Sequence, residues 1–228
     1  MATNKKEVSL GLGLITVFLV VLVSMFMPLF HGHNAMQYLD NLYNSISKGS
    51  AYHIPEAVKV AQSLQGQQID ATLSFGSEVQ ARRTAALLAS GGAEAAATGK
   101  TVNVRGDLGG IYLAALRDAD TLYHNHGTEL AERYGFEERA VLYNWWAATR
   151  SISQVLTKQK RFATAKSLGA INTKALEMSY NYAGITPQQV SDEYLIVFGS
   201  LTFYVLYTLW YGFAIMFLFE GSGFRLKH

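Results

Sequence analysis

Two long apolar segments lie near the two ends of this 228-residue chain, and they constrain its fold more than any other feature. Residues 8–30 and 194–219 contain no charged side chain. Because a helix rises about 1.5 Å per residue, each segment is long enough to cross the roughly 30 Å hydrocarbon core of a bilayer. We therefore predict a mainly α-helical membrane protein in which two transmembrane helices flank a mostly helical domain formed by residues 31–193.

The charges outside the two apolar segments predict an orientation. Lys5 and Lys6 precede the first segment, and Arg225 and Lys227 follow the second. Because positive residues favour the cytoplasmic side, residues 1–7 and 220–228 are predicted to be short cytoplasmic tails. The protein is then expected in the cytoplasmic (inner) membrane, with its main domain periplasmic or extracellular. The first segment lacks a small-x-small cleavage site, which favours a retained signal anchor over a signal peptide.

The composition of the central domain excludes several functions. From residue 32 to residue 193 there are 15 Lys and Arg against 15 Asp and Glu, without a basic cluster, so nucleic acid is not an expected partner. The chain has no cysteine. Disulfides, thiolate metal sites, iron–sulfur clusters and covalently attached c-type haem are therefore excluded.

A short part of the domain has the period of β-structure. Ile69, Ala71 and Leu73 alternate with polar residues, as expected of a half-buried strand. Ser77 and Gln80 then have the spacing of a capping box at the start of a helix. Two further short strands, joined by a turn at residues 98–100, complete a predicted β-α-β-β insert at about residues 68–105.

The rest of the domain has helical periodicity. The predicted helices cover residues 34–47, 55–64, 108–124, 137–161 and 164–182. Asp107 is the expected N-cap of the third of these. Thr186, Pro187 and Gln189 resemble the start of one more helix, which we predict to continue without a break through the second apolar segment.

Polar-tipped aromatic residues recur along the second apolar segment. Tyr204, Tyr207 and Tyr211 are three and four positions apart, with Ser200 and Thr208 close by in sequence. A phenolic hydroxyl that faces lipid lacks a hydrogen-bonding partner, which costs free energy. These residues are therefore predicted to contact another helix, either of a different subunit or of the chain's own first span.

Other residues extend the predicted helix contacts. Ser9, Gly13 and Gly199 are small enough to permit close helix approach. In the domain, Trp145 and Trp146 are predicted to be core or partner-interface residues, with a ligand-stacking platform as the alternative.

Histidine supplies the chain's candidate metal ligands. His31 and His33 form one His-x-His pair, and His124 and His126 form a second, with Asp120 one helical turn before it. Such pairs can bind copper or zinc, and histidine can also ligate non-covalent haem. However, residues i and i+2 point about 200° apart on a regular helix, so each pair needs a bent backbone to converge. Purely structural roles at helix ends are the alternative, and no catalytic residue is predicted.

These features lead to three functional hypotheses. The first is a non-catalytic accessory or scaffolding subunit of a multi-subunit membrane complex, for example a respiratory one, whose partners are other membrane protein subunits in a hetero-complex or homo-oligomer. The second is a metal-, haem- or quinone-linked redox subunit. The third is an extracytoplasmic sensor or a regulator of polysaccharide chain length. The two-span topology is similar to that of such regulators, but their proline-rich signature near the second span is missing here.

Overall fold

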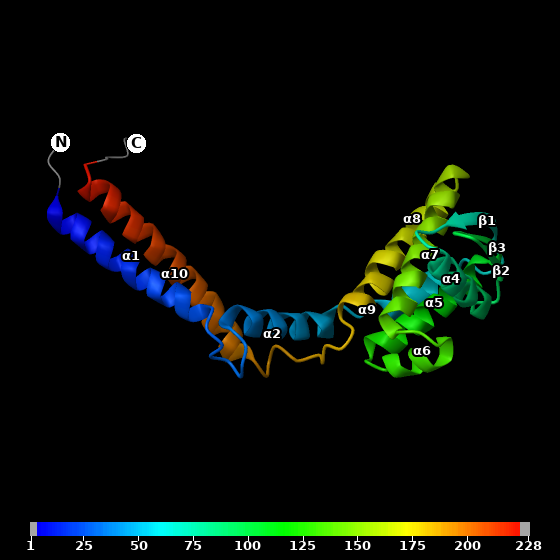
Figure 1. Cartoon of the computed structure of the whole chain (residues 1–228), viewed down its shortest axis with the longest axis horizontal. Helices are drawn as coiled ribbons and strands as arrows, with labels where there is room; N and C mark the ends of the chain where they lie inside the picture. Colours follow the sequence, from blue (N-terminus) through cyan, green and yellow to red (C-terminus); the bar gives the residue numbers. More distant parts are fainter. Residues whose placement is uncertain (1–3, 224–228) are drawn as a thin grey trace. The chain divides into compact units, whose positions relative to one another are not determined.

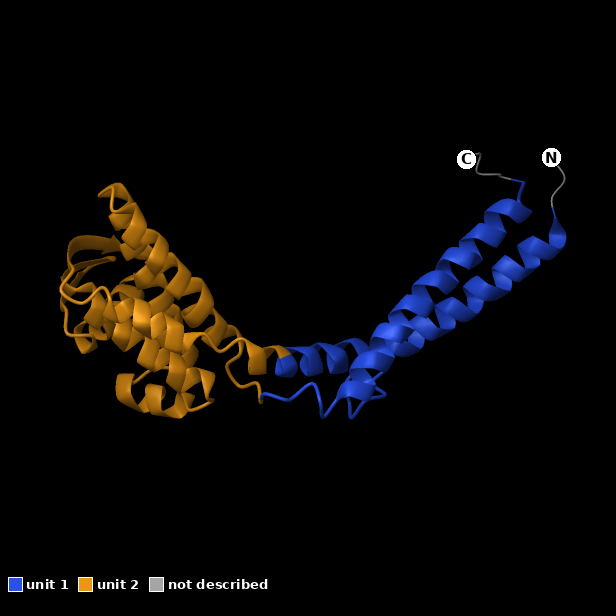
Figure 2. Ribbon diagram, turned by 180° about the vertical axis from the view of Figure 1, so that it is seen from behind, with its two compact units in different colours: residues 1–46, 187–228 blue, residues 47–186 orange. Residues whose placement is uncertain are grey.

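The computed structural model describes residues 4–223, and within them the chain is mostly helical with one three-stranded sheet. Figure 1 shows these elements, and contacts divide the chain into the two compact units of Figure 2. Unit 1 comprises residues 1–46 and 187–228, and unit 2 comprises residues 47–186. The predicted helical class and small sheet are confirmed. Arg225 and Lys227, on which part of the predicted orientation depends, lie outside the described residues.

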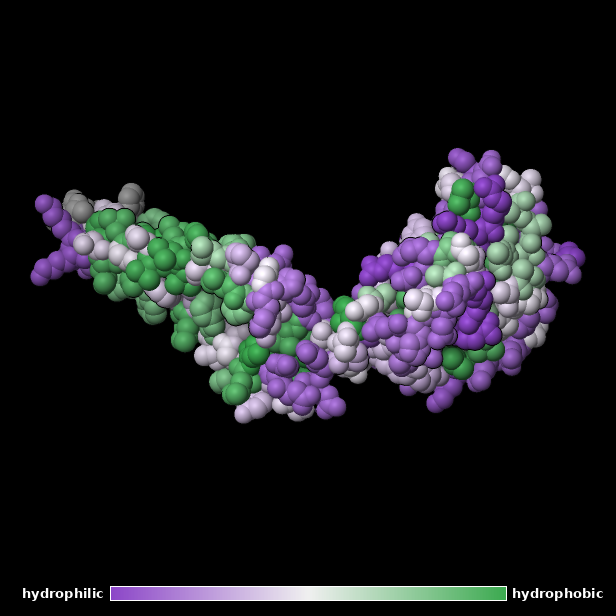
Figure 3. Space-filling view, turned by 60° about the horizontal axis from the view of Figure 1, so that its bottom comes forward, coloured by the Kyte–Doolittle hydropathy of each residue, from purple (hydrophilic) through white to green (hydrophobic). Residues whose placement is uncertain are grey.

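Unit 1 contains both apolar helices, α1 (Lys5–Met25) and α10 (Tyr194–Gly221), which lie side by side and antiparallel (Figure 1). Each is long and apolar enough to cross a membrane. Figure 3 shows the hydrophobic surface that they expose. Helix α1 ends five residues before the apolar segment does, because Pro28 disfavours helical conformation in the residue before it.

The third helix of unit 1 is α2 (Ala35–Ser50), whose last residues belong to unit 2. Asn34 Oδ1 accepts a hydrogen bond from Gln37 N at 2.8 Å, and Gln37 Oε1 accepts one from Asn34 N at 3.2 Å. This reciprocal pair satisfies two free N–H groups at the start of the helix. The helix continues to Ser50 instead of ending at the predicted residue 47.

The sheet of unit 2 confirms the β-α-β-β prediction. Its elements are β1 (Gln68–Ser74), α4 (Glu78–Ser90), β2 (Glu94–Thr98) and β3 (Thr101–Asp107). Strand β3 is central and antiparallel to both neighbours, so α4 connects the two edge strands in a split β-α-β arrangement. The expected N-cap, Ser77, accepts a hydrogen bond from Gln80 N, and Ile69 and Leu73 are buried.

Helices make up the remainder of unit 2. They are α3 (Ile54–Gln62), α5 (Leu108–Tyr123), α6 (Gly127–Tyr134), α7 (Glu138–Lys158), α8 (Phe162–Ile171), the π-helical η1 (Asn172–Glu177) and α9 (Met178–Asn181). Asp107 caps α5 as predicted, because its Oδ2 accepts from Gly110 N at 2.7 Å. After α5, Asn125 has a left-handed φ of 62°, which ends the helix.

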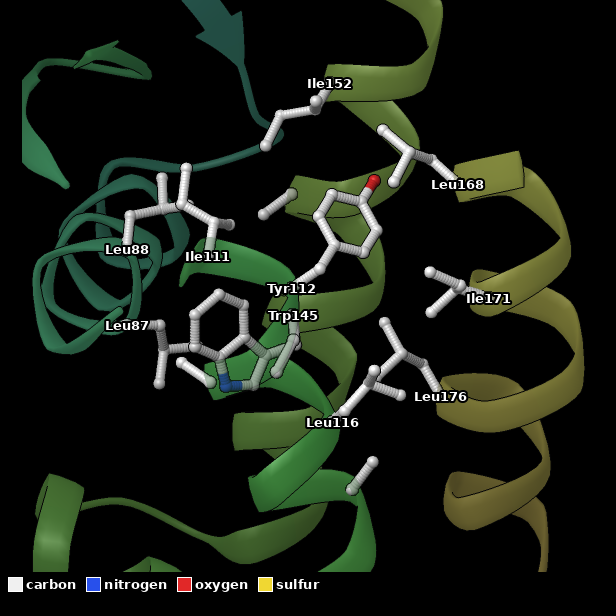
Figure 4. Packing of buried hydrophobic residues seen from close by; sticks show 14 of the residues in the cluster. Leu87, Leu88, Ile111, Tyr112, Leu116, Trp145, Ile152, Leu168, Ile171 and Leu176 are labelled. Atoms are coloured by element: carbon white, nitrogen blue, oxygen red, sulfur yellow. The ribbon is translucent and has the colours of Figure 1, made fainter. Parts of the chain in front are cut away.

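The core of unit 2 lies where α5 and α7 meet α4 and the segment α8–η1 (Figure 4). Trp145 and Tyr112 are its largest fully buried side chains. Tyr112 donates its hydroxyl to the carbonyl of Thr149 at 3.0 Å, so its polar tip is satisfied inside the core. The aromatic bulk and the surrounding Leu and Ile side chains give unit 2 a hydrophobic core of its own.

One predicted element is wrong. Residues 185–189 form no regular element, and α10 begins only at Tyr194, so no continuous helix leads from Pro187 into the apolar segment. Gln188 N donates to Ser45 O of α2 at 3.1 Å. That contact fixes the segment in an extended course along α2, and a local capping pattern cannot reveal it.

Candidate functional site

Small residues bring α1 and α10 into close contact. Gly11 and Ala214 are buried, as is Gly221. A Cβ atom added to Gly11 would lie 2.8 Å from Leu218 Cγ, and one added to Gly221 would lie 2.6 Å from Val8 N. The two helices can therefore approach this closely only because glycine occupies these positions.

Two of the polar residues predicted to contact another helix have partners within unit 1. Tyr207 donates its hydroxyl to Phe18 O of α1 at 2.9 Å, and the two rings stack with centroids 4.2 Å apart. The Ser200 hydroxyl lies 2.8 Å from the Tyr43 hydroxyl of α2. These contacts stabilise the packing of unit 1 and leave no free polar group at either position.

Tyr204 is different, because its side chain is 70% exposed and its hydroxyl makes no hydrogen bond to any residue in the range 4–223. Thr208 Oγ1 donates to the Tyr204 carbonyl at 2.7 Å, so the threonine is satisfied locally. Tyr211 is also half exposed, with its ring 5.3 Å from that of Phe18. Tyr204 lies ten residues into α10, which at about 1.5 Å per residue is near the middle of a membrane span.

The predicted small residues lie away from the contact between the two helices. Ser9 and Gly13 line a shallow groove of about 720 Å³ on α1, together with Lys5 and Lys6 at its polar end. A Cβ atom on Gly13 or on Gly199 would meet nothing within 4 Å. Gly11, which makes the close contact, could not be found from the sequence, because the partner's position decides which face of a helix meets it.

The four candidate histidines are divided equally between the two units. His31 and His33 lie in unit 1, in the turn after α1, where His31 has a left-handed φ of 51°. In unit 2, His124 Nδ1 lies 3.3 Å from Asp120 Oδ1, whereas His126 Nδ1 lies 3.9 Å from Glu129 Oε1. Over residues 4–223, no group of three or more His, Cys, Asp or Glu side chains could hold a metal ion.

Asp120 joins a small polar cluster that the sequence analysis did not predict. The Tyr52 hydroxyl donates to Asp120 Oδ1 at 2.7 Å, and the Tyr52 ring packs against those of Tyr123 and His124. Partial burial, the hydrogen bond to Asp120 and the charge of that carboxylate together raise the pKa of Tyr52 to about 12. The tyrosine is therefore neutral at physiological pH and acts as a hydrogen-bond donor.

A buried lysine is a second feature that the sequence did not reveal. Lys48 Nζ donates to Asn125 Oδ1 at 3.1 Å and to the carbonyls of Tyr182 and Ile185 at 3.0 and 2.6 Å. Its ammonium group also lies 5.0 Å from the centre of the Tyr123 ring. Burial lowers the pKa of Lys48. The three acceptors link the end of α2 to the end of α5 and to the segment after α9.

The two tryptophans of α7 have different environments. Trp145 is fully buried, and its Nε1 donates at 2.8 Å to Asp118, a buried carboxylate that also accepts from Arg133 and Tyr134. Trp146 is partly exposed, with the Arg150 guanidinium 5.0 Å from its ring centre. Trp145 therefore belongs to the core, and Trp146 is the one within reach of a partner.

Comparison of the chain with known protein families, with curated proteins and with solved structures finds no match. The functional interpretation therefore rests on the residues of this chain and their contacts. Their clearest feature is the contrast in α10 between Tyr207, which has a partner inside unit 1, and Tyr204, which has none among the described residues.

Proposed function

We propose that this protein is a non-catalytic accessory or scaffolding subunit of a multi-subunit membrane complex. The observation that carries the proposal is the Tyr204 hydroxyl, which is exposed near the middle of α10 and makes no hydrogen bond within residues 4–223. In a bilayer there is no water at this depth to accept a hydrogen bond from the hydroxyl. A helix of another subunit, with a carbonyl or hydroxyl facing Tyr204, satisfies the group and explains its presence.

The groove over Ser9 and Gly13 supports the same proposal. Interfaces between membrane helices are rich in small residues, because these allow the backbones to approach closely. The contact between α1 and α10 already uses Gly11, and an added Cβ atom on Gly13 meets nothing. The groove is thus available to a partner helix, from a different protein or from a second copy of this chain.

The proposed orientation places the main domain outside the cytoplasm. Lys5 and Lys6 begin α1, and positive residues at a membrane helix end favour the cytoplasmic side. The protein then lies in the cytoplasmic (inner) membrane, with unit 2 on the periplasmic or extracellular side. There, Tyr143 and Trp146, which stack on the surface of α7, offer an aromatic site for docking a soluble part of the complex.

Purification from native membranes in a mild detergent, with mass spectrometry of the co-purifying chains, tests this proposal. Gly13→Leu fills the groove and is expected to reduce recovery of the partner at least about tenfold. Tyr204→Phe removes one interhelical hydrogen bond worth about 0.6 kcal/mol, so about a threefold reduction is expected. Val23→Leu and Tyr194→Phe are matched controls at exposed positions of the same two helices.

Two results would contradict the subunit proposal. One is a wild-type protein that purifies as a single chain without any stable partner, whether foreign or a second copy. The other is equal partner recovery from the Gly13→Leu variant and from its Val23→Leu control. Circular dichroism of each purified variant shows whether the helices are intact, so that a folding defect is not taken for a lost interface.

A redox function is our second proposal, and one contact favours it. The Asp120 carboxylate lies 3.3 Å from His124 Nδ1, as in carboxylate–histidine–metal arrangements, in which the other ring nitrogen binds the ion. Copper and non-covalent haem are the redox groups that would bind there, whereas zinc would give a metal site without redox chemistry. Elemental analysis and a visible spectrum test it, with His124→Ala expected to remove the bound metal and His53→Ala, outside this cluster, as the control. A metal-free wild-type protein purified without chelators would contradict this proposal.

A further inference from the structure

Unit 1 contains a largely apolar pocket of about 470 Å³ between α1, α2 and α10. Its walls include Phe30, Leu39, Ile196 and Phe203. Its size lies within the range of about 300–1,000 Å³ that is typical of ligand pockets. All of its lining residues come from unit 1, at the end of α1 opposite Lys5 and the start of α10.

The two serine hydroxyls of this pocket are already engaged. Ser24 Oγ donates to Val21 O at 2.7 Å, and Ser200 Oγ donates to Val197 O at 2.9 Å while also contacting Tyr43. The two serines therefore need no hydrogen bond from a ligand. Hydrocarbon suits it, because burying apolar surface gains about 25 cal/mol per Å² and leaves no polar group unsatisfied.

A second, smaller pocket of about 180 Å³ shares Tyr38 with the first, includes Leu42, and has a larger share of polar residues in its lining. It is lined by Asn41, Ser45, Gln188 and Glu193. No Lys or Arg occurs in residues 26–47 or 187–194, so these segments offer Glu193 no basic partner. An apolar pocket and a pocket with one carboxylate are thus both lined by Tyr38.

We propose that the two pockets together hold one membrane lipid. Its hydrocarbon chain occupies the apolar pocket, and an ammonium-bearing headgroup of the ethanolamine type donates hydrogen bonds to Glu193 in the second pocket. The proposal rests on the membrane location given under the proposed function, but not on the presence of a partner subunit. The missing basic residues argue against an anionic headgroup, whose charge Glu193 would repel.

Gly199 offers a direct test, because it lines the apolar pocket and an added Cβ atom there meets nothing within 4 Å. Gly199→Phe therefore fills the pocket without a backbone clash. Gly212→Phe is the matched control, since Gly212 is also on α10 and equally open but lies outside the pocket. Glu193→Gln keeps the shape of the side chain and removes the charge that selects the headgroup.

The full-length protein, purified in detergent, is equilibrated with mixed micelles containing equal parts of ethanolamine, choline and glycerol phospholipids, and retained lipid is counted by native mass spectrometry. We expect one retained ethanolamine lipid in the wild-type and Gly212→Phe proteins, and at least about tenfold less in Gly199→Phe. Glu193→Gln is expected to bind a lipid but to lose the preference for ethanolamine.

Equal retention in Gly199→Phe and Gly212→Phe would overturn the site, and a preference for glycerol or choline lipid would overturn the headgroup assignment. An isoprenoid quinone carried through purification in place of the lipid would also overturn it. Flotation with vesicles, measured on each variant, shows whether the protein is in the membrane at all. A protein that floats but retains no lipid contradicts this inference alone, whereas one that does not float contradicts the membrane location on which both proposals rest.

Discussion

The two units bury their apolar side chains in different ways. Unit 2 surrounds Trp145 and Tyr112 with leucine and isoleucine (Figure 4), and the side chains of this core are buried. In unit 1, α1 and α10 pack only against each other over most of their length and leave Leu12, Val20 and Leu206 more than half exposed. Unit 2 has the core of a water-soluble domain, whereas unit 1 needs an apolar medium or a partner around it.

Polar groups show the same contrast. In unit 2, the buried Asp118 has three donors, and the buried Lys48 has three acceptors. The exception in unit 2 is the buried Ser179 hydroxyl, which has no hydrogen bond within the described part of the chain. In α10, both the Tyr204 hydroxyl and the buried Trp210 indole N–H have none there. Of these groups, only the Tyr204 hydroxyl is exposed on the surface of α10, which is why the proposed function rests on it.

The largest expected effect is in unit 2, at Asp118. Asp118→Ala leaves the buried Trp145 indole N–H and the partly buried Tyr134 hydroxyl without their acceptor, and each such unsatisfied group costs about 1–3 kcal/mol. Asp70→Ala, which removes an exposed ion pair to Arg105, should cost at most about 1 kcal/mol. Denaturant unfolding followed by tryptophan fluorescence measures both, and similar losses would show that Asp118 is not a structural centre.

The same substitution in the two units sharpens the comparison. Leu88 is fully buried in unit 2, so Leu88→Ala should lower the free energy of unfolding by about 2–5 kcal/mol. Leu201 of α10 is 55% exposed, and Leu201→Ala should leave that free energy nearly unchanged. Thermal unfolding of the two variants in detergent checks this pair. A large loss from Leu201→Ala would mean that unit 1 is packed more tightly than its exposure indicates.

Within unit 1, two glycines separate an internal contact from an external one. Gly11→Leu forces a side chain against Leu218 and should push α1 and α10 apart by about 2 Å or more from their close packing. Gly13→Leu should leave the pair unchanged, because its Cβ atom meets nothing. Since the chain has no cysteine, spin labels on cysteines introduced at Val20 and Val205 can report the distance. Identical distances in both variants would contradict the contact at Gly11.

The smallest expected effect is the pH dependence that Tyr52 confers on unit 2. Its folded-state pKa of about 12 lies above the usual value of 10.0, so the folded state disfavours the ionised form. This contribution to stability is therefore fully present below pH 10 and is lost as the pH rises from about 10 to about 12. Asp120→Asn should shift the tyrosinate absorbance of Tyr52 to lower pH. An unchanged titration would show that the Asp120 contact does not raise the pKa of Tyr52.

The sequence predicts well those features that depend on local pattern. Alternation at Ile69 and Leu73 predicted a strand, and Asp107 was correctly expected to cap a helix. Contacts between distant segments could not be predicted from the sequence. Gln188 binds α2 where a helix was expected, and the buried Lys48 has all of its acceptors in other elements. For α1, sequence showed that Gly13 and Ser9 are small, but only the position of α10 shows that Gly11 makes the contact.

The site predictions divide along the same line. The spacing of the tyrosines in α10 indicated a polar stripe, but the structure was needed to distinguish Tyr207, which binds Phe18 O, from Tyr204, which is exposed. The pairing of His124 with Asp120 follows from their i, i+4 spacing. The contact of Tyr52 with Asp120 could not be foreseen, because 68 residues separate the two in sequence.

The central claim is that α1 and α10 cross a membrane and place unit 2 on the side opposite Lys5. Because the chain lacks cysteine, single cysteines introduced as Lys100→Cys in the β2–β3 turn and as Lys5→Cys at the start of α1 report each side without background. Labelling with a membrane-impermeant maleimide is compared before and after permeabilisation of the membrane. We predict that Lys100→Cys reacts on intact cells or spheroplasts and that Lys5→Cys reacts only after permeabilisation. Equal labelling of both positions before permeabilisation, or labelling of Lys5→Cys alone at that stage, would contradict the account.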